Sequence, residues 1–510
     1  MTARPSTDWL PLLPSKISGV GLLTLLCVAI LVMTPTITYW RTVAHEYGFR
    51  DDYSRLREVR EEPDKTVQVM ASDGRPIGGF LLERSLRWVY DVTDLPWLRL
   101  AGVLLLTATG LALWALLRRS HWPELDAAAV GLGVALLPGA QVIAAWAIAW
   151  PIALGLLLAV AGCAAVEAWI SRSAPRSTLW SGCLCYLIAG LTYQSSALFA
   201  VVPLAAMLLT RRADARPTVK TWTTVHLGIL AGCLAADFLL MHALFALGVF
   251  EASDRLQIET DPLGKLLWFA SQPLPNALGL YALRDSFATD PFFWVTGLGV
   301  ATIIAFGWRL DVRSDPARRG RWAFALLALP FIAHGVSLAA AERAIGYRTL
   351  IALSGLVLVL SIFSLRRIAE TWRLKSSMRH ATLTALLFIA AVLADHNAFS
   401  LIAVPQGNEW TIVRDASRKI VPSKDTRVYI VTPTLADRST RRVFADEFGS
   451  LSADSDWAPR EMLKAALRHR FRSGLPRGDA LSVTLSRLAP GLGRYSLIID
   501  MRQLKRLRPH

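Results

Sequence analysis

Long apolar runs joined by short, arginine-rich links occupy residues 17–402 of this chain. About 20 apolar residues cross the hydrocarbon core of a bilayer as an α-helix, so each run predicts a membrane span. Two stretches are too long for single spans and contain breaks, at Pro138-Gly139 and at 193–196, which predict hairpins. The pattern predicts eleven spans: 17–38, which we expect to be a retained signal anchor, 98–117, 127–145, 150–170, 179–193, 195–209, 222–247, 291–308, 322–340, 349–364 and 382–402.

The basic residues of the links predict the orientation of the spans, because cytoplasmic links of membrane proteins are enriched in Lys and Arg. Clusters at 118–119, 211–220, 309–321 and 366–379 fall on one side only if both long stretches are hairpins. We therefore expect the N-terminus on the cytoplasmic side and the segment after residue 402 on the outer side.

The composition is that of an integral membrane protein, with 53% hydrophobic residues, 18% charged residues and a mean hydropathy of +0.40. The net charge of +16 is concentrated in the links, where it meets anionic lipid headgroups, and we expect no nucleic-acid partner. The five cysteines lie in apolar segments and indicate no disulfide framework or thiolate metal site. Phosphate-loop, dinucleotide-binding, H-E-x-x-H and nucleophile-elbow motifs are absent from the sequence, so a nucleotide-driven pump and a zinc hydrolase have no support.

Residues 1–402 are predicted to form a membrane domain with outer loops at 39–97 and 248–290. The segment 403–510 is predicted to be a small soluble α/β domain without a catalytic motif. Its expected elements are a helix around 408–420, a strand at 427–432, a helix around 458–470, and strands near 481–485 and 495–499. The expected fold class is therefore mainly α, a polytopic membrane protein with a small extracytoplasmic α/β domain.

Two adjacent acids, Asp51 and Asp52, open a charged, helix-like run in the first outer loop. Such a pair can act as a general base and its orienting partner, or can hold a divalent cation. The alternative is structural: Asp52 would cap a helix beginning at Tyr53, and Asp51 would favour its positive end.

Three arginines on the expected outer loops, Arg75, Arg343 and Arg348, could bind a phosphate through the guanidinium fork. Any one of these arginines alone could equally well contact a lipid headgroup. Together with the acids they make a plausible site, because a reaction that releases a phosphate needs fixed positive charge where negative charge develops.

Two further outer-side features concern the membrane interface. Leu82, Leu86 and Val89 recur at helical spacing, with Trp88 and Trp97 nearby, and predict an amphipathic helix in the interface. In the second loop the residues Trp268, Gln272, Pro273, Pro275 and Asn276 predict a short interfacial or re-entrant helix that ends in a proline-rich turn.

These features together resemble the bacterial serotype-converting glucosyl transferases that modify the O-antigen of lipopolysaccharide, multi-span enzymes of the GT-C class. The resemblance covers residues 17–402. It rests on Asp51-Asp52-Tyr53-x-Arg55 followed by Gly74-Arg75-Pro76-Ile77, on the Tyr193-Gln194 break, and on the Trp268…Gln272…Asn276 loop.

The resemblance implies a glycosyltransferase on the outer face of the bacterial inner membrane. It would move a sugar, such as glucose, from a polyprenyl-phosphate donor to a lipid-linked glycan or another cell-envelope acceptor. Asp51 or Asp52 would be the catalytic acid of the family, and Arg75, Arg343 or Arg348 would stabilise the leaving phosphate without a metal or other cofactor. Tyr193 and Gln194 would line the acceptor cleft, or would satisfy backbone groups freed by the helix break. Trp268, Gln272 and Asn276 of the second loop would also bind substrate.

Two other function classes stay open at this stage. A transporter or flippase for a lipid-linked glycan would need acids and arginines in mid-membrane, whereas here they cluster in the expected outer loops. The ionisable residues of the expected spans are too scattered to indicate a proton relay: Glu167, His226, Asp237, His242, His334 and Asp395. A non-catalytic envelope assembly protein would use the acids as helix caps and the outer tail for binding. Only the enzyme requires that Asp51 or Asp52 be essential for sugar transfer.

Overall fold

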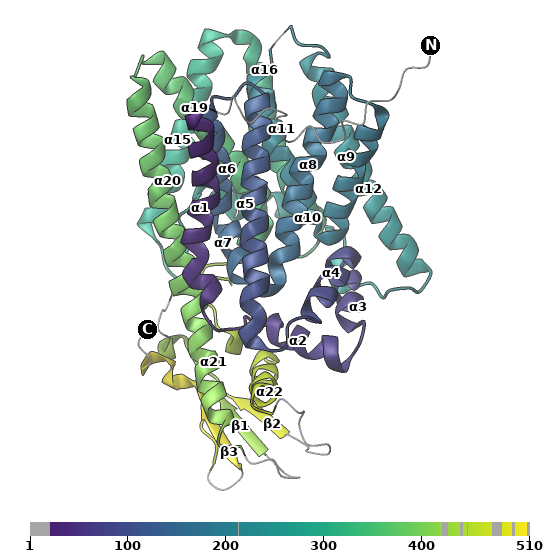
Figure 1. Ribbon diagram of the computed structural model, residues 1–510, viewed down its shortest axis with the longest axis vertical. Helices are drawn as coiled ribbons and strands as arrows, with labels where there is room; N and C mark the ends of the chain where they lie inside the picture. The colour runs from purple at the N-terminus through teal and green to yellow at the C-terminus, as the bar shows by residue number, and fades with distance from the viewer. Residues whose placement is uncertain are drawn as a thin grey trace.

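The computed structural model describes residues 21–212, 214–420, 427–438, 442–445, 447–471, 482–491 and 495–506. A bundle of long helices forms most of the molecule, and a small α/β domain is attached to one end of it (Figure 1). The expected mainly α fold with a small C-terminal α/β domain is confirmed. Residues 1–20, which hold the expected N-terminal basic residues and the start of the first span, lie outside the described residues.

Seven helices in the described part of the chain are long and apolar enough to cross a membrane. The helices that form these candidate spans are α1 (Leu22–Ala44), α5 (Leu95–Arg119), α8 (Trp150–Arg172), α12 (Val219–Ala246), α15 (Pro291–Ser314), α19 (Ile351–Thr371) and α20 (Ser376–Ala398). An eighth span is possible if α6 (Glu124–Leu136) and α7 (Pro138–Ala145), which meet at 52°, are counted together. The break expected at Pro138-Gly139 is therefore present, but the expected number of eleven spans is not confirmed.

The expected number of spans exceeds the observed number because two apolar stretches are broken into short helices. The first consists of α9 (Arg176–Thr192), α10 (Gln194–Ala197), η4 (Leu198–Ala200) and α11 (Val201–Thr210). The expected span 322–340 consists of α16 (Arg319–Leu327), α17 (Leu329–Ala333) and α18 (Gly335–Ala339). Pro330 stands at the start of α17, where its missing amide hydrogen and fixed φ end the preceding helix.

The segment 39–97, which the sequence predicts as the first outer loop, is helical along most of its length. It contains α2 (Asp51–Glu61), α3 (Lys65–Ser72), α4 (Pro76–Leu86) and η2 (Val92–Asp94). The helix expected from Tyr53 begins two residues earlier. Leu82, Leu86 and Val89 are buried, as their spacing predicts, while Trp88 is 90% exposed and Trp97 is 70% exposed.

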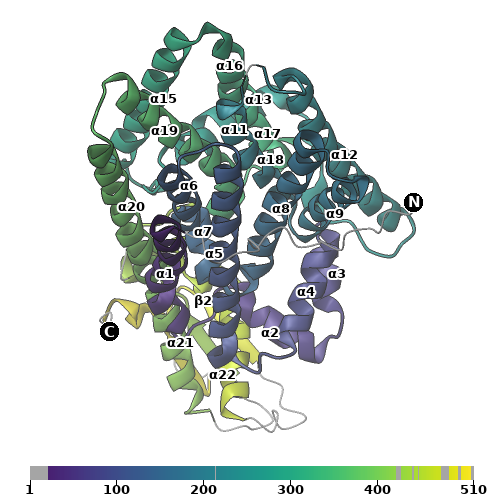
Figure 2. The ribbon, with the colours of Figure 1, turned by 45° about the horizontal axis from the view of Figure 1, so that its top comes forward.

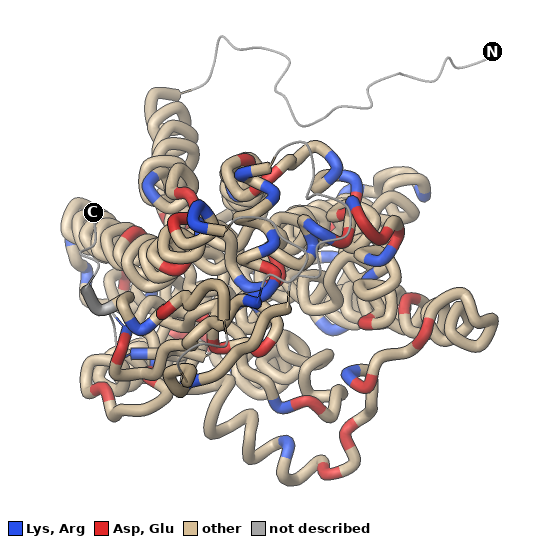
Figure 3. Tube along the Cα trace, turned by 90° about the horizontal axis from the view of Figure 1, so that it is seen from below, with Lys and Arg blue, Asp and Glu red and all other residues tan. Residues whose placement is uncertain are grey.

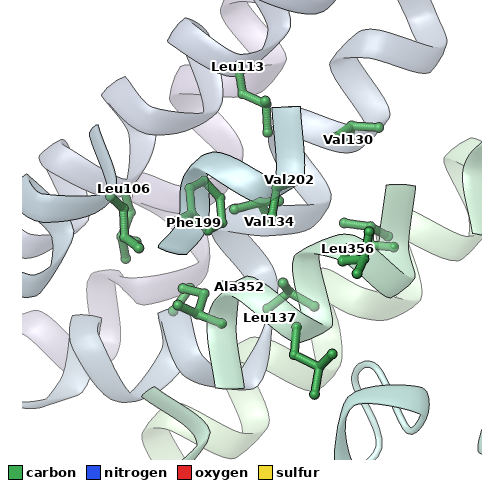
Figure 4. Close-up of a cluster of buried hydrophobic side chains, with 14 of the residues drawn as sticks. Leu106, Leu113, Val130, Val134, Leu137, Phe199, Val202, Ala352 and Leu356 are labelled. Carbon is green, nitrogen blue, oxygen red and sulfur yellow. The ribbon is translucent and has the colours of Figure 1, made fainter. Parts of the chain in front are cut away.

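The centre of the bundle is a continuous apolar core. Leu106, Leu113, Val130, Val134, Leu137, Phe199, Val202, Ala352 and Leu356 pack together there (Figure 4). Helices α5 and α6 approach closely through Gly110 and Gly131, since a Cβ on Gly131 would lie 2.4 Å from the Gly110 carbonyl oxygen. Small residues at such a crossing allow two backbones to touch, as is usual between membrane helices.

The C-terminal domain is joined to the bundle without a loop. Helix α20 passes through a π-helical segment, η8 (Phe399–Ala403), into α21 (Val404–Ser417), so the expected boundary at 402/403 falls inside a 42-residue helix. The domain contains β1 (Arg427–Val431), α22 (Ala458–Arg470), β2 (Ser482–Ser486) and β3 (Leu497–Asp500). The strands are parallel in the order β2-β1-β3 and lie within two residues of their expected positions, and α22 matches the expected helix. Residue 481 of the expected second strand lies outside the described residues.

The domain docks on the first outer loop, and α22 lies against α2 (Figures 1 and 2). Arg57 Nε donates to Glu461 at 2.7 Å, and His469 Nδ1 lies 2.9 Å from Asp91. Seen from this end, both acidic and basic residues are found along the chain trace (Figure 3).

Candidate active site

The two adjacent acids have different surroundings. Asp52 is completely buried, its Oδ2 accepts a hydrogen bond from the amide of Phe49 at 2.8 Å, and its Oδ1 accepts one from the amide of Ile148 at 3.2 Å. Neither amide belongs to α2, so the expected role of Asp52 as the cap of that helix is wrong. The carboxylate instead joins the α1–α2 link to η3 (Ala147–Ala149). Burial raises the pKa of Asp52 to about 7, although the two amides and Arg99 favour its ionised form.

Asp51 is the first residue of α2 and is half-buried. Its carboxylate makes no hydrogen bond or ion pair with any residue that the structure describes. Of the two candidate acids, Asp51 alone has a side chain that is available to a substrate.

The Gly74-Arg75 turn and the Tyr193-Gln194 break, separated by more than a hundred residues in sequence, meet in the structure. Gln194 Nε2 donates to the carbonyl oxygens of Asp73 and Gly74 at 3.0 and 2.9 Å. Its Oε1 accepts from Arg75 Nε at 3.3 Å, and the Arg75 guanidinium lies 4.5 Å from the centre of the Tyr193 ring. Gln194 therefore organises the turn rather than the helix break, and its expected place in the acceptor cleft stays a prediction.

Glycine is required in this turn. Gly74 has a φ of +79°, and a Cβ there would lie 2.6 Å from Gln194 Nε2. Within the described part of the chain, no carboxylate is paired with the Arg75 guanidinium. A neutral amide holds this cation, so its charge is not compensated locally.

Arg348 lies on the other side of Tyr193, whose hydroxyl is close enough to interact with its guanidinium. The guanidinium also lies 4.9 Å from the centre of the Trp146 ring. Unlike Arg75, it is compensated, because Arg348 Nη1 donates to Glu447 Oε1 at 2.5 Å. Burial raises the pKa of Glu447, and Arg348 and the amide of Tyr347 act in the opposite direction.

Arg343 belongs to a separate group of charges. Its guanidinium pairs with Asp261 at 3.0 Å and with Glu259 at 3.4 Å, and it is substantially exposed. The buried Lys265 stands next to it and donates to the carbonyl oxygens of Ala340 and Glu342. The structure does not bring Arg343 together with Arg75 and Arg348.

The second outer loop contains α13 (Pro262–Ser271) and α14 (Pro273–Leu278), the short helices expected there. Gln272 Oε1 accepts from Arg284 Nη1 at 3.1 Å, and Asn276 Oδ1 accepts from the Tyr347 hydroxyl at 3.1 Å. Both residues line a cavity of about 210 Å³. Trp268 lies elsewhere, with its ring 5.8 Å from that of His334 and 4.6 Å from Lys265 Nζ.

A chain of direct contacts joins the segments that carry the candidate residues. The rings of Phe49 and Trp146 are 5.0 Å apart, and Trp146 contacts Arg348, which contacts Tyr193, which contacts Arg75. The start of α2, the α7–α8 connection, the segment before α19, the α9–α10 break and the start of α4 therefore converge.

Sequence reasoning missed Trp146, Arg284, Tyr347 and Glu447. Tyr347 stands beside Arg348 in a segment with an evident charge pattern, so a closer reading could have included it. Glu447 comes from the tail, where no motif marks it. Each oxygen of Asp52 already accepts a backbone amide, and no group of three or more metal-binding side chains is present among the described residues.

Comparison with known proteins gives limited information. No family model matches the chain, and no curated protein matches it in sequence. Among solved structures, the chain is similar to the oligosaccharyltransferase of Archaeoglobus fulgidus in two crystal structures. One is tethered to an acceptor peptide containing the NVT sequon, with 13% identity and a TM-score of 0.37 over 87% of this chain and 63% of that one. The other is a complex with Zn and sulfate, with 14% identity and a TM-score of 0.40 over 87% of this chain and 61% of that one. The chain thus spans less than two thirds of the length of these proteins, and scores this low carry no argument about activity.

Proposed function

We propose that this protein is a membrane glycosyltransferase of the GT-C class, which moves a sugar from a polyprenyl-phosphate donor to a hydroxyl of a cell-envelope glycan. The reaction would take place on the outer face of the inner membrane. One observation carries the proposal. The Asp51 carboxylate has no partner among the described residues, and Phe49, two residues before it, begins the chain of contacts that ends at the uncompensated guanidinium of Arg75.

Asp51 is the general base in this scheme. As the acceptor oxygen forms a bond to the anomeric carbon, the bond from that carbon to the phosphate oxygen breaks. The acceptor proton passes to the Asp51 carboxylate, and the polyprenyl phosphate leaves as an anion. A positioned base contributes typically about 10²–10⁴-fold to such a step, and a single displacement inverts the anomeric centre.

Arg75 stabilises the departing phosphate. Its guanidinium is held between the Tyr193 ring and the Gln194 amide, so it is in place before negative charge develops. Arg348 contributes less, because Glu447 already compensates its charge. Asp52 takes no part in proton transfer and positions Asp51 by fixing the start of α2 to η3.

The test is transfer of labelled sugar from polyprenyl-phosphate donors to envelope glycan in membranes with matched expression. Asp51→Asn should lower the rate about 10²–10⁴-fold. Asp64→Asn is the matched control, because Asp64 is an exposed acid of the same loop and caps no amide with its side chain. The proposal fails if wild-type membranes transfer none of the common sugars, or if Asp51→Asn transfers at the wild-type rate.

A flippase for the lipid-linked glycan is the second candidate, favoured by one residue. Asp237 on α12 is buried, and neither carboxylate oxygen has a hydrogen-bond partner among the described residues. An unpaired acid in a membrane helix is typical of transport pathways. In that case Asp237→Asn would stop movement of the lipid-linked glycan across vesicle membranes, and Asp51→Asn would not.

A further inference from the structure

A polar cavity of about 290 Å³ lies beside the first turn of α15. Its wall includes Arg284, Asp285, Phe287, Asp290 and Trp294. It shares residues 284–286 with the cavity at Gln272 and Asn276, so the two form neighbouring compartments. None of the residues unique to the larger cavity has a role in the transfer scheme.

The charges of this cavity nearly cancel. Asp290 Oδ2 lies 3.5 Å from Arg442, and Asp285 Oδ2 lies 4.0 Å from the same side chain. The other oxygen of each acid accepts a backbone amide, that of Phe292 or of Phe287. Arg284 supplies the second positive charge and has no carboxylate partner among the described residues. The wall thus carries two acids and one guanidinium, and Arg442 pairs with both acids from outside the wall, so the mixed charges favour a ligand with many dipoles and no net charge.

Aromatic surface lies next to these polar groups. Trp294 is 47% exposed and Phe287 is 67% exposed, and the Arg284 guanidinium lies 5.3 Å from the centre of the Trp294 ring. A pyranose ring is complementary to such a wall, because its faces are apolar C–H surfaces and its rim carries hydroxyl groups. Each hydroxyl can donate to a carboxylate and accept from a guanidinium, while an aromatic ring covers the apolar face.

We propose that this cavity binds a sugar residue of the neutral acceptor glycan. The inference rests on the proposed function in that the glycan is the acceptor of the transfer. The cavity is also joined to the candidate active site, because the Arg284 amide donates to the Tyr347 hydroxyl at 2.9 Å and the Tyr347 amide donates to Glu447 at 2.6 Å. Glu447 pairs with Arg348, so one hydrogen-bonded path connects the sugar subsite with the cation beside Tyr193.

The C-terminal domain contributes to this subsite. The Ser286 amide donates to the Val443 carbonyl oxygen at 2.8 Å, and Ala445 lines the smaller cavity. Arg442 faces the two acids, so the segment 442–445 contacts residues of the cavity wall from outside it. The proposal thus assigns the C-terminal domain a part in binding the acceptor.

Binding can be measured without transfer. The purified full-length protein in nanodiscs would be applied to an array of neutral oligosaccharides ending in glucose, galactose, rhamnose or N-acetylglucosamine, with sialylated and sulfated glycans as charged counterparts. Titration with the best probe would then give a Kd for the wild type and for the variants Trp294→Ala and Phe287→Ala. Truncation of an aromatic anchor should raise the Kd about tenfold. Trp308→Ala is the matched control, because Trp308 is an exposed tryptophan on the same helix, away from the cavity.

Asp51→Asn separates this inference from the proposed function. It should abolish transfer and leave the Kd of the probe unchanged, so loss of transfer without loss of binding supports both. If Asp51→Asn transfers normally while Trp294→Ala weakens binding, the base assignment fails and the subsite stands. The subsite is overturned if no neutral glycan binds, if charged glycans bind better, or if Trp294→Ala and Trp308→Ala bind like the wild type, in which case Trp294 serves only as a membrane-interface residue.

Discussion

Replacement of Asp52 by Asn tests whether this acid is a buried tether, as its contacts indicate. Burial raises the pKa of Asp52 from its usual 3.8 to about 7. Between these two values the folded protein keeps the carboxyl protonated while the unfolded chain loses the proton. Folding then binds a proton, so stability falls as the pH rises through this window and is level above it.

The magnitude follows from the shift. Each pKa unit corresponds to 1.36 kcal/mol, so a shift of about three units corresponds to about 4 kcal/mol of stability lost between pH 4 and pH 7. Asn cannot ionise and resembles the protonated acid in shape. The melting temperature of the wild type minus that of Asp52→Asn should therefore fall by several degrees from pH 4 to pH 7 and stay constant from pH 7 to pH 8.5.

The assay is thermal unfolding of detergent-purified protein, followed by intrinsic fluorescence in steps of half a pH unit. Asp64→Asn serves as the control, and its difference from the wild type should not depend on pH. A pH-independent difference for Asp52→Asn would refute the assignment of Asp52 as a buried titrating tether. Loss of transfer in Asp52→Asn as complete as in Asp51→Asn, with folding intact, would refute the division of roles between the two acids.

The remaining predictions concern the cations of the cluster. Arg75→Gln should lower the transfer rate about 10²–10³-fold. Arg75→Lys should restore little of that rate, because a lysine cannot both stack on the Tyr193 ring and bond to Gln194 as the guanidinium fork does. Single-turnover transfer with a saturating donor measures both variants, and a wild-type rate in Arg75→Gln contradicts the role of Arg75. Glu447→Gln should lower the free energy of unfolding by about 1.5–3 kcal/mol, since it weakens two hydrogen bonds to a buried carboxylate. Thermal unfolding measures that loss, and an unchanged melting temperature would show that the Arg348 pair adds nothing to the docking of the tail.

Elements with a strong local pattern could be predicted from the sequence. Helix α22 was predictable because apolar residues recur at helical spacing among charged ones between 458 and 470. Strand β1 was predictable because RVYIV is rich in β-branched and aromatic residues. The break at Pro138-Gly139 is also a local property. The number of membrane spans could not be predicted from local pattern. The apolar composition continues across Pro330 and Gly335, but the helix is interrupted at both residues.

The candidate site was only partly predictable, since its members are defined by contacts distant in sequence. The acid pair, the Gly-Arg turn and the Tyr193-Gln194 break stood out as local irregularities, and the structure brings these segments into one cluster. The difference between Asp51 and Asp52 depends on the amide of Ile148, which lies 96 positions beyond Asp52. The difference between Arg75 and Arg348 depends on Glu447, a residue of the tail that no local pattern marks.

The contacts of the C-terminal domain argue that it is part of the working unit. Glu46, just after α1, bonds to Trp410 and Arg414 of α21, and Glu447 bonds to the residues at the start of α19. The domain therefore touches the chain on both sides of the candidate site and also bonds to Ser286 of the sugar cavity. Deletion of the tail would disturb all of these contacts at once and could not distinguish binding from folding. Single substitutions such as Glu447→Gln and Trp294→Ala separate the two, because one changes an ion pair of the folded core and the other an exposed ring.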